Sequence, residues 1–230
     1  MSAPEIRRAA FPPGTCLAII DLDGTLLKGL NAERIFDLYL AIHGHVGLLR
    51  MIGFLLSLIR DSVRIGFRKA LGTNARFLRG QAPDRVRAWA REFGRAYLRR
   101  AVPEDLRAKI LSLKDQGCRI VLLTGSLQMI ADQLQDRLQA EVVIGTELEV
   151  VGGVLTGRKT GIFAYGPGKL DALFGRLDPA GIDWKNSWAL ADRISDLPVF
   201  ELVGHPVAVH GDRRLRRLAR KLGWETVGRR

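Results

Sequence analysis

The sequence is poor in cysteine and in aromatic residues. Its 230 residues include two cysteines, and Phe, Trp and Tyr make up 7% of the chain. Two cysteines supply neither a disulfide framework nor the ligand spacing of a zinc site. Cys16 and Cys118 each lie at the start of an apolar run, so we expect two buried, reduced thiols in a cytosolic protein. No aromatic platform accompanies the arginines, which disfavours nucleic acid as a partner.

The sequence also has no uninterrupted apolar run of membrane-spanning length. Residues 38–59 are the most hydrophobic stretch, but they contain Gly44 and Arg50. A central arginine costs about 2.5–3.5 kcal/mol on membrane-insertion scales, so a span is disfavoured. Residues 1–14 lack the apolar segment of a signal peptide. We expect a cytoplasmic location, with association to a membrane surface as the alternative.

Acidic residues are outnumbered by basic ones. The chain has 36 Lys and Arg against 24 Asp and Glu, a formal charge of +12. The excess lies in residues 28–102 and in a cluster at the end of the chain, which a solvated surface would also explain. The positive electrostatic field of this charge excess favours anionic partners, which include phosphate esters, anionic lipid and nucleic acid. It does not discriminate among them. The terminal cluster consists of Arg213, Arg214, Arg216, Arg217, Arg220, Lys221, Arg229 and Arg230.

The most informative stretch is residues 16–27. An apolar, β-branched run ends in Asp21 and Asp23, followed by Gly24 and Thr25. This is the pattern of a buried strand that carries acids at its carboxyl end, where open parallel sheets bind ligands. Two carboxylates on one face of a strand repel each other unless a proton or cation lies between them. A hard divalent cation such as Mg²⁺ fits that role. The alternative is a solvated turn after an ordinary strand.

Three later segments repeat the pattern of polar residues at the end of an apolar run or the start of a helix. Residues 118–126 form an apolar run ending in Thr124 and Gly125, where a hydroxyl and free N–H groups suit a phosphate. Lys169 opens the expected helix 170–175. Residues 187–198 form an apolar run that ends in Asp192, with Asp196 four residues later. Residues 146–160 indicate a hairpin with its turn at Gly152 and Gly153, and 206–210 indicate another strand.

Residues 31–100 contain helix formers and no strand alternation. We expect an all-helical insertion with a hinge near Gly44 and an amphipathic, basic helix over 46–69. Such a helix can lie in a membrane interface or pack its apolar stripe on a neighbouring helix. The sequence therefore predicts an α/β fold with two parts. A Rossmann-like parallel sheet core is formed by residues 1–28 and 102–230, and an all-helical cap by residues 29–101.

Taken in order, these segments resemble the four motifs of the haloacid dehalogenase superfamily of phosphohydrolases. The cap between the first two motifs is similar to that of the phosphoserine-phosphatase-like subgroup. The resemblance implies a phosphate-ester substrate, with Asp21 as nucleophile, Asp23 as general acid and base, and Mg²⁺ as cofactor. It also implies that the anion is bound by Thr124, Gly125 and Lys169 and the metal by Asp21, Asp23, Asp192 and Asp196. Arg193 replaces the usual small residue after Asp192. We expect it either to change the hydration of the metal site or to turn into the pocket and bind substrate anion.

The cap departs from the subgroup in one position. Phosphoserine phosphatases carry a substrate-binding Glu nine residues after the nucleophile, where this chain has Leu30, with Glu33 further on. This disfavours phosphoserine. The hydrophobic, basic cap instead suggests an amphiphilic or lipid phosphate such as phosphatidylglycerophosphate, and peripheral contact with an anionic membrane through the cap. The alternatives are phosphatase activity on a small soluble metabolite and a catalytically silent anion-binding or membrane-binding protein. The sequence predicts no oligomeric state.

Overall fold

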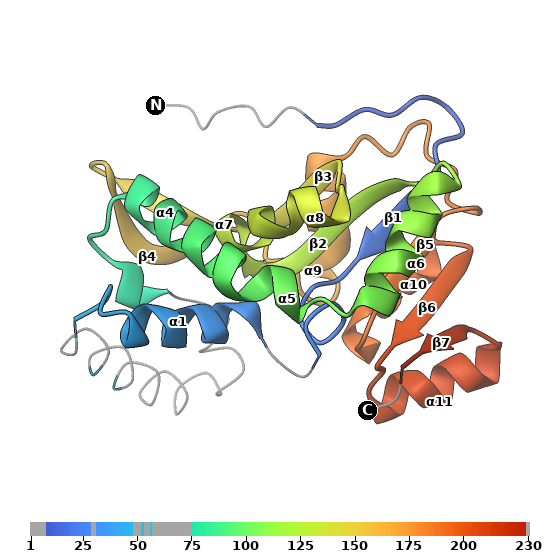
Figure 1. Ribbon diagram of the computed structural model, residues 1–230. Coiled ribbons are helices and arrows are strands. Elements are labelled where there is room, and N and C mark those ends of the chain that lie inside the picture. The colour runs from blue at the N-terminus through green and yellow to red at the C-terminus, as the bar shows by residue number, and fades with distance from the viewer. Residues whose placement is uncertain (1–7, 29–30, 48–51, 53–55, 57–74, 229–230) are drawn as a thin grey trace.

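The computed structural model describes residues 8–28, 31–47, 52, 56 and 75–228. Figure 1 shows a central twisted sheet with helices on both of its faces, and α1 and α11 at the lower edge of the view. The predicted second helix of the cap, 46–69, lies almost entirely outside the described residues. Among the described residues, no helix combines the length and the apolarity needed to cross a bilayer.

The described strands form a single sheet in the order β4-β3-β2-β1-β5-β6-β7. All neighbouring pairs are parallel except β3 with β4, which pair antiparallel as a hairpin. This confirms the predicted α/β fold with a parallel core. β1 lies at the centre of the sheet, between β2 and β5. The strands are β1 (Leu17–Ile20), β2 (Arg119–Leu127), β3 (Val142–Val151), β4 (Val154–Thr160), β5 (Trp188–Ala191), β6 (His205–Val209) and β7 (Glu225–Val227).

Alternate residues of β1 enter two separate hydrophobic cores. Ala18 and Ile20 belong to one cluster, and Leu17 and Ile19 to the other. Successive side chains of a strand point to opposite faces, so an unbroken apolar run is what a sheet covered on both sides requires. The described helical elements are α1 (Ala32–Ile42), η1 (Arg76–Leu78), α4 (Pro83–Phe93), η2 (Gly94–Leu98), α5 (Arg99–Ala101), α6 (Glu104–Asp115), α7 (Gln128–Ala131), η3 (Asp132–Leu134), α8 (Gln135–Leu138), α9 (Gly168–Arg176), η4 (Ile194–Asp196), α10 (Leu197–Leu202) and α11 (Arg213–Leu222).

The segment after the undescribed part of the helical insertion is joined to the β3–β4 hairpin through the backbone. Ala75 donates its N–H to the carbonyl of Gly157, and Gly80 donates to Leu155, whose own N–H bonds Gln81. A Cβ on Gly157 would meet Cα of Arg76 at 2.8 Å, so the two backbones pass too closely for a side chain at this point. The β3–β4 hairpin therefore extends the sheet alongside residues 75–81 of the insertion.

The expectation of two separate reduced thiols is wrong. The structure joins Cys16 and Cys118 in a disulfide, with their Cα atoms 4.5 Å apart. The reason is the register of the sheet: Leu17 pairs with Arg119 in adjacent parallel strands, so the residues that precede them also lie side by side. Because these cysteines form a disulfide, they give no reason to expect a reducing compartment.

Candidate active site

The polar segments singled out in the sequence meet at one edge of the sheet. Asp21 directly follows β1, Thr124 and Gly125 lie near the carboxyl end of β2, and Asp192 directly follows β5. Because these three strands are parallel neighbours, their carboxyl ends share one edge. The loops leaving this edge also bring in the remaining predicted residues, which are Asp23, Lys169, Arg193 and Asp196.

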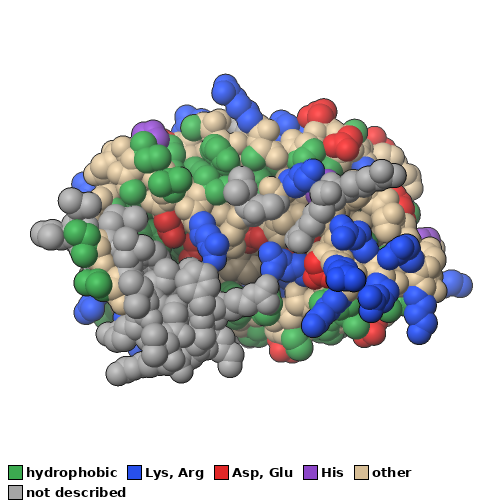
Figure 2. Space-filling view, turned by 90° about the horizontal axis from the view of Figure 1, so that it is seen from below, with side chains coloured by type: hydrophobic (Ala, Val, Ile, Leu, Met, Phe, Trp, Pro, Cys, Tyr) green, Lys and Arg blue, Asp and Glu red, His purple; other side chains and the backbone are tan. Residues whose placement is uncertain are grey.

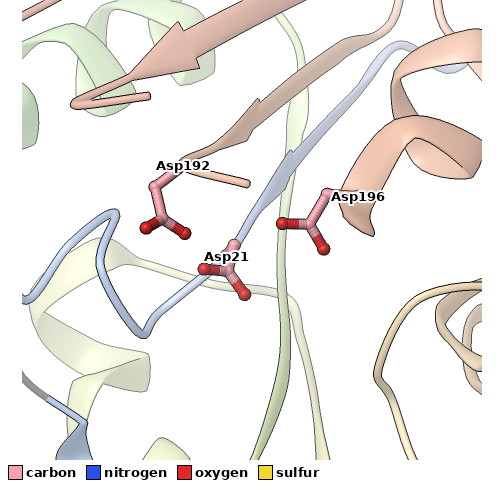
Figure 3. Close-up of side chains that lie close together, drawn as sticks. All are labelled: Asp21, Asp192 and Asp196. Atoms are coloured by element: carbon pink, nitrogen blue, oxygen red, sulfur yellow. The ribbon is translucent and has the colours of Figure 1, made fainter. Parts of the chain in front are cut away.

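Three buried carboxyl groups form the centre of the site. Asp21, Asp192 and Asp196 each offer one oxygen, and these oxygens lie within 4.8 Å of one another. Figure 3 shows the Asp192 and Asp196 carboxyl groups on either side of that of Asp21. Their side chains are 9% exposed or less. Such a set of hard oxygen atoms suits a magnesium-sized cation.

Lys169 partly neutralises this acidic group. Its ammonium lies 2.6 Å from Oδ1 of Asp21 and 2.8 Å from Oδ1 of Asp196. The lysine follows Gly168 in the first turn of α9, and a Cβ on Gly168 would collide with the carbonyl of Phe163. Burial alone would lower the pKa of Lys169, but Asp21 and Asp196 raise it above its ordinary value. Lys169 is therefore a fixed positive charge at the centre of the site.

Asp23 is held apart from the three acids by its own hydrogen bonds. Its Oδ1 accepts from the N–H of Ala32 at 2.7 Å, and its Oδ2 accepts from the Ser126 hydroxyl at 2.7 Å. Burial raises the pKa of the Asp23 carboxyl, while Ala32 and Ser126 act in the opposite direction. The structure does not bring the Asp23 carboxylate into the group formed by Asp21, Asp192 and Asp196. Ser126 was not predicted, although its position two residues after Thr124 on a strand places both side chains on one face.

Gly24 allows the first motif to approach the fourth. It has a φ of +91°, and a Cβ on it would collide with the Asp192 carboxylate. Only a glycine combines this left-handed backbone with such a close approach. A glycine at position 24 is thus needed to admit the Asp192 side chain beside β1.

The other three predicted anion-binding residues, Thr124, Gly125 and Arg193, make different contacts from Lys169. Thr124 is fully buried; its Oγ1 accepts from the Ser126 N–H at 3.0 Å and lies 3.4 Å from Oδ2 of Asp23. The carbonyl of Gly125 accepts from the Thr146 hydroxyl. Arg193 is half-exposed, and its Nε lies 3.5 Å from Oδ2 of Asp192. The guanidinium therefore lies against a carboxylate at the edge of the site.

A second charged group lies beside Asp23. Glu33, in the first turn of α1, pairs with Lys159 of β4 at 2.8 Å, with the two side chains 12% and 7% exposed. Glu33 directly follows Ala32, whose N–H bonds Asp23. Burial is the main cause of the raised pKa of Asp23, and the Glu33 charge adds to it. Burial first, and then the Glu33 charge, raise the pKa of Asp37 well above its usual value.

Comparison with known proteins agrees with this geometry. The family model for haloacid dehalogenase-like hydrolases matches residues 18–201. Phosphoserine phosphatase SerB1 of Mycobacterium tuberculosis is 30% identical over 220 residues, which cover 92% of this chain and 70% of that protein. A phosphoserine phosphatase of Archaeoglobus fulgidus is 27% identical over 155 residues, or 67% of this chain and 43% of the relative.

Solved structures share the fold. A protein of unknown function from Bordetella pertussis Tohama I superposes with a TM-score of 0.77 at 23% identity, over 94% of this chain and 99% of the other. A phospho-aspartyl intermediate analogue of phosphoserine phosphatase superposes with a TM-score of 0.61 at 18% identity, over 94% and 95% of the two chains. The family match spans all four predicted motif positions. This chain belongs to the haloacid dehalogenase-like hydrolases, in the phosphoserine-phosphatase-like subgroup.

Proposed function

We propose that this phosphatase hydrolyses phosphomonoesters through an aspartyl-phosphate formed on Asp21. The observation that carries the proposal is the position of Lys169 between Asp21 and Asp196, with Asp192 in the same group. A carboxylate is a weak nucleophile, and fixing it in line with phosphorus is what makes it effective. The positive charge of Lys169 lies where the transferred phosphoryl oxygens would carry negative charge.

The first half of the reaction needs one nucleophile and one proton donor. As the oxygen of Asp21 bonds to phosphorus, the bond from phosphorus to the leaving oxygen breaks, and Asp23 gives that oxygen a proton. In the second half, water attacks the aspartyl-phosphate and Asp23 takes up the proton that the water loses. The hydrogen bonds from Ala32 and Ser126 support this role because they fix the orientation of the Asp23 carboxyl group.

The residues at the centre of the site fit a Mg²⁺ ion. Asp21 and Asp192 would hold it, with Asp196 directly or through water, while Gly24 leaves the space beside Asp192 that a Cβ would fill. When bound, the cation neutralises negative charge on the phosphoryl group. The predicted ligand role of the Asp23 side chain has less support, because both of its oxygens accept other hydrogen bonds.

The helical segment 29–101 would act as a cap over this site, as the sequence suggested. Its first helix supports this division, because the N–H of Ala32 in α1 bonds Asp23 and Glu33 lies beside the same carboxyl group. The leaving group of a substrate would therefore meet the Glu33–Lys159 pair.

Two substrate classes deserve comparison. The relatives named phosphoserine phosphatase, together with a charged pair near Asp23, favour a small polar phosphate such as phosphoserine. Exposed apolar side chains favour the amphiphilic or lipid phosphate expected from the sequence. They are Leu38 and Ile42 of α1, and Ile52 and Leu56 beyond it.

The test is phosphate release from a generic aryl phosphate, with and without Mg²⁺. We expect release to require Mg²⁺ and to disappear in Asp21→Asn, while Asp115→Asn, a change at an exposed position of α6, leaves it intact. After an acid quench, the wild type should carry one phosphoryl group by mass spectrometry and Asp21→Asn none. Activity that survives in Asp21→Asn would contradict the proposal. Phosphoserine and a short-chain lipid phosphate, assayed side by side, then decide between the substrate classes.

A further inference from the structure

Helix α11 carries an unusual concentration of positive charge. Six of its ten residues are Lys or Arg, and it contains no acidic residue. Leu215 and Ala219 are its buried residues, and they pack against the hydrophobic core. The six cations are all exposed: Arg213, Arg214, Arg216, Arg217, Arg220 and Lys221.

Among the residues that the structure describes, these cations have no acidic partner. Within the described part of the chain, no ion pair joins any of them to a carboxylate, whereas exposed basic residues elsewhere, such as Arg87 and Arg119, do have acidic partners. A solvated face that served only solubility would gain from interspersed signs of charge. The outer side of α11 is therefore a concentrated positive surface open to an anionic partner.

The helix begins at the catalytic edge of the sheet. Asp212, its N-cap, bonds the N–H groups of Arg214 and Leu215, and its own N–H donates to the carbonyl of Asp192. Its Oδ2 also accepts from Ile194, so the start of α11 is tied to the loop that carries two acids of the active site. Figure 2 shows Lys and Arg side chains gathered on one side of the lower face, beside a hollow where acidic side chains are visible.

Apolar side chains accompany the charge. Leu222, at the carboxyl end of α11, is 52% exposed. Leu38 and Ile42, four residues apart on α1, are 59% and 71% exposed, and α1 lies along the same lower edge in Figure 1. Cations combined with exposed aliphatic groups are typical of surfaces that lie in a membrane interface. Surfaces that bind single-stranded nucleic acid add aromatic side chains for stacking, and α11 has none. Duplex DNA is the alternative anionic partner that the experiment below tests.

We propose that α11 docks the protein on an anionic lipid bilayer, with the catalytic edge turned toward the membrane. Basic side chains near an anionic surface each add to the attraction, within a Debye length of the headgroups. The docking itself is independent of catalysis, while the orientation of the active site rests on the proposed function. The predicted membrane contact through the cap helix 46–69 lies almost entirely outside the described residues. The proposed contact through α11 is separate from it.

The experiment measures sedimentation of the full-length protein with vesicles. Vesicles of phosphatidylcholine alone are compared with vesicles in which part of it is replaced by anionic phosphatidylglycerol. The test variant is Arg214→Gln/Arg217→Gln/Lys221→Gln on α11. The control variant, Arg85→Gln/Arg91→Gln/Arg95→Gln, removes the same charge from exposed positions of α4 and η2. Phosphate release from the soluble aryl phosphate is recorded for each protein.

We expect the wild type and the control variant to bind the anionic vesicles only, with loss of binding at high salt. The α11 variant should bind about a hundredfold more weakly, with unchanged activity on the soluble substrate. Equal binding by the two variants, or binding to duplex DNA in place of vesicles, would overturn the inference. A protein that binds vesicles but never releases phosphate would refute the proposed function and leave the docking surface standing.

Discussion

The Ser126 hydroxyl donates a 2.7 Å hydrogen bond to Oδ2 of Asp23, although 103 residues separate the two in the chain. The bond crosses from β2 to the loop after β1. Ser126 is buried, and Asp23 is half-buried. Together with the bond from Ala32 it leaves the Asp23 carboxyl group little freedom to rotate. Ser126 is thus a positioning residue for the proposed proton donor.

Replacing Ser126 by Ala should lower kcat about ten- to a hundredfold with little change in KM. A hydrogen bond to a charged group contributes about 1.5–3 kcal/mol, and here that contribution would orient Asp23 rather than bind substrate. Steady-state kinetics on the aryl phosphate checks this, with Ser112→Ala at an exposed position of α6 as the control. A change in KM alone would show that Ser126 binds substrate instead.

Glycine is required at position 24 for two reasons that can be separated. Gly24 and Gly14 both have positive φ, +91° and +82°, but a Cβ has free space at Gly14 and collides with Asp192 at Gly24. We expect both Ala variants to lose about 1–3 kcal/mol of unfolding free energy through backbone strain. Only Gly24→Ala should also lose phosphatase activity, because it displaces the Asp192 carboxylate. Equal activity in the two variants would be inconsistent with this role.

Much of the fold could be predicted from the sequence because its strands are short apolar runs with polar ends. The run before Asp21 and the run before Asp192 are both strands, and the hairpin turns at Gly152 and Gly153 as expected. The sequence also predicts one helix over 127–139, and the structure has α7, η3 and α8 in succession there. The edge strand β7 was not predicted, since three residues show no clear alternation.

Contacts between distant segments were harder to predict. The Ser126–Asp23 bond and the Cys16–Cys118 disulfide depend on the register of β1 against β2, which no local pattern encodes. Glu33 seemed displaced by counting residues from Asp21, yet it directly follows Ala32, whose N–H bonds Asp23. Sequence order indicated which segments meet at this edge of the sheet but not how their side chains pair.

Reduction of the disulfide should destabilise the protein strongly. Cys16 and Cys118 are 102 residues apart, and the chain-entropy model assigns about 4–5 kcal/mol to a loop of this length. Urea unfolding with and without reductant measures the loss, and Cys16→Ser should match the reduced wild type. An identical unfolding midpoint with and without reductant would mean that the bond does not stabilise the fold.

The carboxyl group of Asp37 should make stability depend on pH. Its Oδ1 is buried and makes no hydrogen bond to the described residues, and burial and Glu33 raise its pKa. Because the folded state binds this proton more tightly, the group stabilises the fold fully below its ordinary pKa of about 4. That stability is lost as the pH rises through the raised pKa of the folded state.

Asp37→Asn should therefore raise the thermal midpoint at pH 7 and have no effect near pH 3.5, about the pH where Asp is protonated in both states. Scanning calorimetry across this pH range checks the prediction, with Asp115→Asn as an exposed control. A variant that is less stable than the wild type at neutral pH would show that the Asp37 carboxylate makes a favourable contact.

The disulfide also makes a closed ring of the chain from Cys16 to Cys118. This ring contains Asp21, Asp23 and the entire helical segment between the first two motifs. A protease that cuts the ring once, at any point along it, leaves both fragments covalently attached. Asp21, the proposed nucleophile, would then remain beside β2 even in nicked molecules, and the cut would be visible on a gel only after reduction.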